Sequence, residues 1–200
     1  MNNNIGSVKL IDHLGDDQRV IQVARRCYRS ENKSNPQADQ NLIRHLITKG
    51  HKTPFEFLVF TFDVEVPIFV ARQWFRHRVA SYTEESLRYC IADESFFLPA
   101  EISREEKEEW INDNLRQFKA YEKWISKGLP KEQARSLLPT GIFTKFYWNV
   151  NGSSLMNFLT LRADKHAQYE IRECANEILS LVKKVAPITF GTFEVINANK

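Results

Sequence analysis

The chain has 200 residues, and its 42% hydrophobic and 26% charged content, with seven glycines and seven prolines, excludes a disordered or collagen-like protein. Lys and Arg number 28 against 25 Asp and Glu, and a net charge of +3 does not by itself indicate a nucleic-acid-binding protein. Cys27, Cys90 and Cys174 form no C-x-x-C pair, so we predict no disulfide framework and expect a reducing, cytoplasmic location. No apolar stretch approaches about 18 residues, so we expect neither a signal peptide nor a membrane span.

The N-terminal region predicts a strand and a helix. A short strand is expected over residues 7–12. Asp16 or Asp17 is predicted to cap a helix that runs to about Tyr28. The apolar face of this helix would be formed by Val20, Val23, Ala24 and Cys27.

A polar loop and a second helix are expected next. Residues 30–37 are polar, and Asn35-Pro36 is typical of a turn. The helix after this turn is predicted to end at Gly50, because glycine favours the position that follows a helix. Its apolar face would be formed by Leu42, Ile43, Leu46 and Ile47.

The clearest strand in the sequence lies at residues 56–66, where Leu58, Phe60, Phe62, Val64 and Val66 alternate with more polar residues. Pro67 ends this strand and can begin a helix over 68–75. The segment 76–89, RHRVASYTEESLRY, is too polar to be core and is expected to be a loop.

The C-terminal half predicts mainly helices. Ser103 and Glu106 match a capping box that begins a long helix ending near Lys127-Gly128, and Pro130 begins a short helix that carries Arg135. The stripe predicted to be buried on the long helix is Ile111, Leu115, Phe118, Tyr121 and Ile125.

One more strand and two helices complete the prediction. The strand covers 142–150 and closes in an Asn151-Gly152 turn. The helices cover 153–162 and about 166–185, and Pro187 stops the second one. Few strands among several helices, without β-α-β alternation, predict an α+β fold with a small antiparallel sheet, in a single domain over 1–200. The alternative is a helical domain with a small hairpin.

The chain lacks the motifs of several common classes of site. Its glycines form neither G-x-G-x-x-G nor a P-loop, so we predict no Rossmann-type or Walker site. Its histidines show no H-x-x-x-H spacing with a cysteine nearby, so we predict no metal site. G-x-S-x-G is also absent, which argues against a serine hydrolase.

The segment 72–88, RQWFRHRVASYTEESLR, is the strongest candidate for chemistry. Its arginines can bind phosphate or carboxylate through two parallel hydrogen bonds, and its aromatic side chains can stack on planar rings. Glu84 and Glu85 can accept hydrogen bonds from ribose hydroxyls or base N–H groups. This composition is typical of a nucleotide or flavin site, and the alternative is a solvated loop with surface ion pairs.

The spacing within this segment, R-H-R-x-x-S-x-x-x-x-S-x-R over 76–88, resembles the signature of the flavin-dependent thymidylate synthases. The segment Gly50–Glu56, the pair Ala134-Arg135, Asn151, Asn157 and the segment Leu161–Ala167 resemble further blocks of that family in the same order. The resemblance spans roughly residues 15–190.

The resemblance implies an enzyme that converts dUMP to dTMP, with 5,10-methylenetetrahydrofolate as carbon donor and NADPH reducing a bound FAD, without a cysteine nucleophile. The FAD contacts that it implies are Thr53, Arg76, His77, Arg78, Glu84, Asn151, Gly152, Ser153 and Asn157. The dUMP contacts that it implies are Gln73, Trp74, Phe75, Arg76, Glu84, Glu85, Ser86, Leu87, Arg88, Arg135 and Arg162.

Four of these residues have implied roles that agree with their chemistry. Arg88 and Arg135 suit the dianionic phosphate, and Ser86 is expected to be a phosphate ligand rather than a nucleophile. Arg162 is expected to be catalytic, because a guanidinium stabilises a uracil deprotonated at N3, whose C5 can then attack. As an arginine at a helix end, Arg162 could instead pair with Asp164 or Glu170.

The resemblance also implies a homotetramer with FAD sites between subunits, which would bury an aromatic surface at Trp74, Phe75 and Tyr82. Two residues depart from the family pattern. Phe57 stands where a histidine is usual, and Ser153 stands where an arginine is usual, which predicts weaker FAD binding. His51 and His166 are expected to be structural, with contact to flavin or folate as the alternative.

Two other functions remain open from the sequence. The first is a paralogue that modifies C5 of another pyrimidine nucleotide such as UMP. The second is a non-catalytic RNA-binding protein that uses the basic, aromatic segment on single strands. The thymidylate synthase hypothesis predicts no nucleic-acid partner and no membrane partner.

Overall fold

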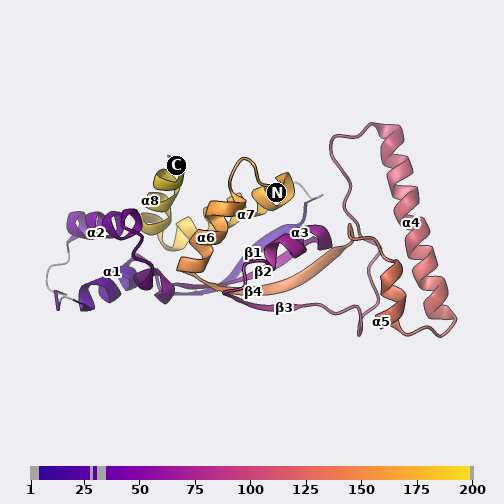
Figure 1. The fold of residues 1–200 in the computed structure, drawn as a ribbon, viewed down its shortest axis with the longest axis horizontal. Coiled ribbons are helices and arrows are strands. Elements are labelled where there is room, and N and C mark those ends of the chain that lie inside the picture. The colour runs from indigo at the N-terminus through magenta and orange to yellow at the C-terminus, as the bar shows by residue number, and fades with distance from the viewer. Residues whose placement is uncertain (1–4, 28, 31–34, 199–200) are drawn as a thin grey trace. The chain divides into compact units, whose positions relative to one another are not determined.

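The computed structural model describes residues 5–27, 29–30 and 35–198. Within these residues, four strands form one sheet in the order β1-β2-β4-β3, namely β1 (Ser7–Leu14), β2 (Val59–Pro67), β3 (Ser81–Glu84) and β4 (Phe143–Asn151) (Figure 1). The helices are α1 (Asp17–Arg26), α2 (Pro36–Thr48), α3 (Ile68–Trp74), α4 (Arg104–Ser126), α5 (Lys131–Ala134), α6 (Gly152–Arg162), α7 (Tyr169–Val185) and α8 (Pro187–Ala198). Two 3-10 turns accompany them, η2 (Thr53–Phe57) and η3 (Arg135–Leu137). The predicted α+β class is confirmed.

The sheet is antiparallel, as the contacts between β2 and β4 indicate. The side-chain nitrogen of Asn149 donates to Oγ1 of Thr61 at 2.9 Å, and Lys145 Nζ lies 3.6 Å from Glu65 Oε1. Residue numbers therefore fall on one strand as they rise on the other. The predicted alternation in β2 is confirmed, because its inward side chains from Phe60 to Val66 are fully buried.

The chain divides into two compact units. The long-helix unit consists of the described part of Met1–Ser7 together with Val64–Arg76 and Thr83–Phe146, and it contains α3, α4 and α5. The cavity unit consists of the described parts of Val8–Asp63, His77–Tyr82 and Tyr147–Lys200, and it contains α1, α2, α6, α7 and α8. A single domain over 1–200 stays a prediction.

Aromatic side chains form the core of the cavity unit. Trp148 of β4 packs on Phe62 of β2 and on Phe158 of α6, with ring centroids 5.6 and 4.9 Å apart. Phe190 of α8 packs edge to face on Phe60 at 5.7 Å. In this unit α8 also packs on α2 and α7, and α6 packs on α7 and η2. This aromatic core holds α6 and α8 in place, and both helices line the cavity described below.

The long-helix unit is stabilised by the contacts of α4. The predicted capping box at the start of α4 is confirmed: Ser103 Oγ accepts from the Glu106 amide, and Glu106 Oε2 accepts from the Ser103 amide. Helix α4 packs on α5 and η3, and its Tyr121 hydroxyl accepts from the Ala92 amide at 3.2 Å. These contacts anchor the loop between β3 and α4 within this unit.

Two predicted turns are helix caps instead. Asn35 accepts from the Ala38 amide at 2.9 Å and caps α2, which begins at Pro36. Asn151 accepts from the Ser154 amide at 2.8 Å and caps α6. Asn and Pro are common both in turns and at the first turn of a helix. The local sequence therefore does not distinguish a turn from a helix cap.

Pro187 was predicted to stop a helix, and it is also the first residue of a further helix. Helix α8 (Pro187–Ala198) was not predicted, and its first turn is capped from a distance by Asp17, whose carboxylate accepts from the amides of Ile188 and Thr189, each at 2.8 Å. Because the cap is 171 and 172 residues away in sequence, no local pattern reveals it.

Two further predictions were wrong in detail. The segment 76–89 contains the unpredicted edge strand β3, whose short, polar sequence lacks an apolar alternation. Cys27 is exposed instead of lying on the apolar face of α1, and Cys90 is exposed as well. The predicted helix end at Tyr28 lies outside the described residues.

Candidate functional site

The residues predicted to form the site divide between the two units. The cavity unit holds Thr53, His77, Arg78, Asn151, Gly152, Ser153, Asn157 and Arg162. The long-helix unit holds Gln73, Trp74, Phe75, Arg76, Glu84, Glu85, Ser86, Leu87, Arg88 and Arg135. The first group contains most of the expected FAD contacts, and the second contains most of the expected dUMP contacts.

Arg162 and His77 lie together in the cavity unit, although 85 residues separate them in sequence. Arg162 is the last residue of α6, and its Nε–H donates to Nε2 of His77 at 3.0 Å. The alternative partner Asp164 instead accepts from the backbone amide and the ring of His166. The end of α6 therefore brings the expected catalytic arginine against the histidine of the R-H-R triplet.

The His77 side chain is half-buried and held from two sides. Its ring packs edge to face on Phe158 at 4.9 Å, and its backbone carbonyl accepts from the Tyr82 hydroxyl at 2.8 Å. Burial and, secondly, the positive charge of Arg162 lower the pKa of His77 to about 4. Burial likewise raises the pKa of Tyr82 to about 12. Both groups are therefore neutral near pH 7, and the imidazole can accept a hydrogen bond.

Arg88 and Arg135 lie together in the long-helix unit through Glu132. Arg88 Nε lies 4.0 Å from Oε2 of Glu132, and Arg135 Nε donates to the backbone carbonyl of Glu132 at 3.2 Å. Both arginines are exposed. Each guanidinium is therefore exposed and has Glu132 as a neighbour, Arg88 at its carboxylate and Arg135 at its backbone carbonyl.

The loop after β3 supplies further polar groups near Arg88. Ser86 Oγ accepts from the Arg88 amide at 3.3 Å, and the Ser86 carbonyl accepts from the amides of Tyr89 and Cys90. Glu84 accepts from the Thr144 hydroxyl at 2.7 Å. This turn orders the segment 84–90, so its hydroxyl and carboxylate groups are held on β4 and on the turn itself.

Glu85 is tied to the sheet at the same place. Its backbone amide donates to the carbonyl of Lys145 at 2.9 Å, and its carboxylate accepts from the Lys145 amide at 3.2 Å. Burial raises the pKa of Glu85. A carboxylate already engaged in this way is chiefly an anchor for the loop.

Trp74 belongs to the core and not to an aromatic surface. Its side chain is fully buried, and it packs edge to face on Phe146 at 5.5 Å. Phe75 is half-buried against the same ring at 5.0 Å. The expectation of a surface at Trp74, Phe75 and Tyr82 is therefore wrong for Trp74, because α3 directs this residue into the packing under β4.

The start of α6 places three expected FAD residues. Asn151 caps the helix, and Gly152 fits a tight space, since a Cβ there would lie 2.7 Å from the carbonyl oxygen of Phe55. The Gly152 amide donates to the Leu58 carbonyl at 2.8 Å. Ser153 follows on the next position and lines a cavity. Gly152 therefore sets how closely α6 approaches η2.

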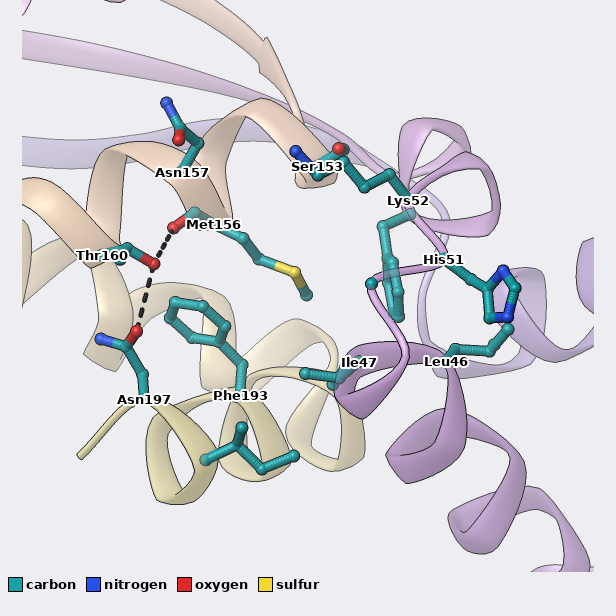
Figure 2. A pocket seen from close by; sticks show the side chains of 13 residues that line it. Leu46, Ile47, His51, Lys52, Ser153, Met156, Asn157, Thr160, Phe193 and Asn197 are labelled. Atoms are coloured by element: carbon teal, nitrogen blue, oxygen red, sulfur yellow. Dashed lines mark hydrogen bonds between the residues drawn. The ribbon is translucent and has the colours of Figure 1, made fainter. Parts of the chain in front are cut away.

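The cavity next to α6, here called the α6 cavity, has a volume of about 240 Å³ (Figure 2). Its polar lining includes His51, Lys52, Ser153 and Asn157, and Thr160 donates to the Met156 carbonyl at 2.9 Å. Figure 2 shows Met156 of α6 opposite Phe193 of α8, and Asn197 of α8 joined to Thr160. The cavity combines apolar walls with hydroxyl, amide and ammonium groups.

A second, larger cavity of about 760 Å³ lies beside the α6 cavity in the same unit. The two share His51 and Leu46, and the larger one is also lined by Thr53 and His45. The rings of His45 and His51 stack with centroids 6.0 Å apart. The expected cofactor residues Thr53, Ser153 and Asn157 therefore line two neighbouring cavities, of which the larger has the size of a small-molecule site.

The remaining candidates lie at the surface or at its edge. Arg76, Arg78 and His166 are exposed, and Gln73 and Leu87 are half-buried. In the described ranges, no three His, Cys, Asp or Glu side chains are grouped so that they could hold a metal ion. None of the helices over 5–27, 29–30 and 35–198 combines the length and apolar character needed to cross a membrane.

Several residues of these sites were not predicted. Phe193 and Asn197 were missed because α8 was missed, and Glu132 was missed because a lone carboxylate on a short helix has no distinctive spacing. Lys52 lies inside the segment Gly50–Glu56 and could have been named from its position there.

Comparisons with known proteins identify the family of this chain. The family model described as "Thymidylate synthase complementing protein" matches residues 9–188. The flavin-dependent thymidylate synthase of Thermosipho africanus is 42% identical and aligns over 94% of this chain and 90% of its own length. That of Thermosipho melanesiensis is 43% identical, over 96% and 92%.

A solved structure resembles the whole chain as well. A crystal structure described as the UMP/dUMP methylase PolB from Streptomyces cacaoi bound with 5-Br dUMP has a TM-score of 0.87 and 28% identity, and covers 95% of each chain. A match of the family model over nearly all the chain, together with relatives above 40% identity, means that this protein is an enzyme of the flavin-dependent thymidylate synthase family.

Proposed function

We propose that the protein methylates C5 of dUMP to give dTMP, with 5,10-methylenetetrahydrofolate as the carbon donor, NADPH as the reductant and FAD as the bound cofactor. The observation that carries the proposal is that Arg88 and Arg135 are both neighbours of Glu132, and that the Ser86 hydroxyl oxygen accepts from the Arg88 backbone amide. Two arginines and a hydroxyl suit a phosphate monoester dianion, which is the charged group of dUMP. The relatives named above act as flavin-dependent thymidylate synthases, which supports the same reaction here.

Arg162 is the proposed catalytic residue. Its guanidinium would stabilise the uracil ring in its N3-deprotonated form, which is richer in electrons at C5 and can attack the carbon donor without a covalent bond to the enzyme. Gln73, Phe75, Arg76, Glu84, Glu85 and Leu87 are proposed to complete the nucleotide site. Trp74 supports them from the core, since it is fully buried.

The state of Cys174 argues against this cysteine as a nucleophile. This thiol is fully buried, and burial raises its pKa to about 12. A thiolate, which is the nucleophilic form, is therefore strongly disfavoured at this residue.

The cavities of the cavity unit fit a nucleotide cofactor by their donor chemistry. Ser153, Asn157 and Thr53 supply hydroxyl and amide groups, and Lys52 supplies a positive charge for a phosphate. We propose that these residues, with Arg76, His77, Arg78, Glu84, Asn151 and Gly152, hold FAD. FAD, when bound and reduced by NADPH, would supply the hydride that completes the methyl group.

Release of tritium from C5-labelled dUMP tests the proposal, with FAD, NADPH and methylenetetrahydrofolate present and a control without folate. We expect folate-dependent release with dTMP formed. Arg162→Ala should abolish turnover while the protein stays folded, because the uracil anion then loses the positive charge proposed to stabilise it. Arg104→Ala, which removes an exposed arginine of α4, is the matched control and should leave turnover unchanged. Normal turnover in Arg162→Ala would disprove the role of Arg162.

UMP is the alternative substrate. The solved structure with a TM-score of 0.87 is described as a UMP/dUMP methylase, so UMP is the alternative nucleotide. Comparison of kcat/KM for dUMP and for UMP separates the two. A preference for UMP would overturn the assignment to thymidylate synthesis.

A further inference from the structure

The hydrogen bond between His77 and Arg162 gives the histidine a function beyond an expected cofactor contact. Nε2 of His77 accepts from Nε–H of Arg162 at 3.0 Å. A guanidinium is always a donor, so the accepting nitrogen must be unprotonated, and the single ring proton must be on Nδ1. The contact therefore defines one tautomer of a neutral imidazole.

The imidazole is itself fixed on the same helix that carries the arginine. Phe158 and Arg162 are four residues apart in α6, so their side chains are neighbours on one face. His77 packs edge to face on the Phe158 ring at 4.9 Å, and Phe158 is fully buried against Trp148. The ring that accepts from Arg162 thus rests on a rigid neighbour.

The backbone of His77 is held from the sheet. The Tyr82 hydroxyl of β3 donates to the His77 carbonyl at 2.8 Å, and the Tyr82 ring stacks on Trp148 at a centroid distance of 6.4 Å and an angle of 15°. Contacts from β3 and α6 therefore converge on His77, and Trp148 of β4 packs on both Tyr82 and Phe158, which make two of these contacts. Such support is what a long, flexible side chain such as arginine needs to be held in one orientation.

We propose that His77 is a positioning residue that holds the guanidinium plane of Arg162 in the orientation in which its terminal N–H groups meet the pyrimidine. The proposal rests on the catalytic role of Arg162 stated under the proposed function. The proposal also explains why a neutral histidine lies next to a permanent cation. A neutral imidazole can accept a hydrogen bond from Arg162, whereas a protonated imidazole would repel it.

Four variants of the FAD-loaded enzyme test this proposal: His77→Ala, His77→Gln, Arg162→Ala and the double variant His77→Ala/Arg162→Ala. The dissociation constant of dUMP is measured by calorimetry for all four, together with kcat, KM and flavin content. His77→Ala should weaken dUMP binding or lower kcat by about tenfold, because the guanidinium is no longer oriented. His77→Gln should recover most of the loss, because its side-chain oxygen reaches the position of Nε2 as an acceptor.

The double variant identifies the route by which His77 acts. If His77 acts through Arg162, His77→Ala should change dUMP affinity by less than about twofold once Arg162 is already alanine. A loss of the same size in both backgrounds would overturn the proposal. So would loss of flavin from His77→Ala with unchanged dUMP affinity, since that would make His77 only a cofactor contact. His13→Ala, which removes an exposed histidine of β1, is the matched control.

A spectroscopic readout makes the test independent of turnover. With ¹⁵N-labelled arginine, the Nε–H resonance of Arg162 should be protected from exchange in the unmodified protein and in His77→Gln, and unprotected in His77→Ala. Absence of that protection in the unmodified protein would refute the bond itself. Absence of dTMP formation by the unmodified enzyme would refute the proposed function, and full turnover in Arg162→Ala would refute the catalytic role of Arg162. Full turnover in His77→Ala with inactive Arg162→Ala would refute only the positioning role.

Discussion

The imidazole of His77 is neutral beside Arg162 in the folded protein. The free energy of unfolding therefore depends on pH. The pKa of His77 in the folded protein is about 4, below the ordinary 6.5. Between these two values the unfolded chain binds a proton that the folded chain does not bind. The free energy of unfolding therefore falls as the pH is lowered from about 6.5 to about 4.

His77→Gln should remove this part of the pH dependence. Urea denaturation at a series of pH values should show a shallower slope for the variant over that window. The slopes of the unmodified protein and the variant should differ by at most about 1.4 kcal/mol per pH unit. Solvent screening reduces this difference, because the ring is only half-buried. Identical slopes for the two proteins would mean that His77 is protonated equally in both states.

Arg135 is expected to bind the phosphate and not the base. Arg135→Ala should therefore weaken dUMP binding by about tenfold or more, the effect of losing one charge-assisted contact, while deoxyuridine binding stays unchanged. Calorimetry with the two ligands checks this prediction. Equal losses for both ligands would place Arg135 away from the phosphate.

Two glycines of the cavity unit offer a matched comparison. A Cβ at Gly152 would lie 2.7 Å from the Phe55 carbonyl oxygen and 3.1 Å from Leu58 Cβ, whereas nothing lies within 4 Å of one at Gly191 in α8. Gly152→Ala should therefore destabilise the protein by about 1–3 kcal/mol, and Gly191→Ala should stabilise it by about 0.5–1 kcal/mol. Thermal unfolding of both variants tests the pair, and equal shifts would contradict the close approach of α6 to η2.

At the scale of elements, one carboxylate joins the start of α1 to the start of α8. Asp17 is buried and accepts from two backbone amides of α8 at 2.8 Å each. Asp17→Ala should lower the free energy of unfolding by about 1–3 kcal/mol, because those amides lose a charged acceptor in a buried place. Asp12→Ala on the exposed side of β1 removes the same charge and should cost less than about 0.5 kcal/mol. Similar effects of the two substitutions would rule out this cap.

Helix α8 also links stability to the α6 cavity. Its Phe193 and Asn197 line the α6 cavity, so loosening its first turn through Asp17 would disturb that lining. This connection is the physical reason why a residue at position 17 bears on a site formed largely by residues 46–52 and 153–160.

At the scale of the whole molecule, we expect four chains to assemble, as the family resemblance implies. Exposed apolar side chains on the sheet, Ile11, Leu14 and Tyr147, give such an assembly surface to bury. Size-exclusion chromatography with light scattering should report four times the 23.4 kDa of one chain. A mass of one chain at micromolar concentration would contradict the expectation.

Much of this architecture could be predicted from local patterns. The alternation in β2, the capping box of Ser103 and Glu106, and the helical stripe of α7 each depend on residues near one another in sequence, so the pattern predicted the element. The elements that were not predicted depend instead on residues far away in the sequence. Helix α8 is capped by Asp17, and β3 is a strand because β4 lies beside it. Asn35 and Asn151 show a third case, in which one residue type serves turns and caps alike.

By itself, then, the sequence determined the α+β class, the core strand and the motif segment that points to a flavin-dependent thymidylate synthase. Only the tertiary structure decided that Arg162 meets His77, that Arg88 and Arg135 meet at Glu132, and that Trp74 is core. The physical reason is distance along the chain. Local propensity and periodicity depend on neighbours within a few residues. The contacts of Arg88 with Glu132 and of His77 with Arg162 join side chains 44 and 85 positions apart, which only packing brings together.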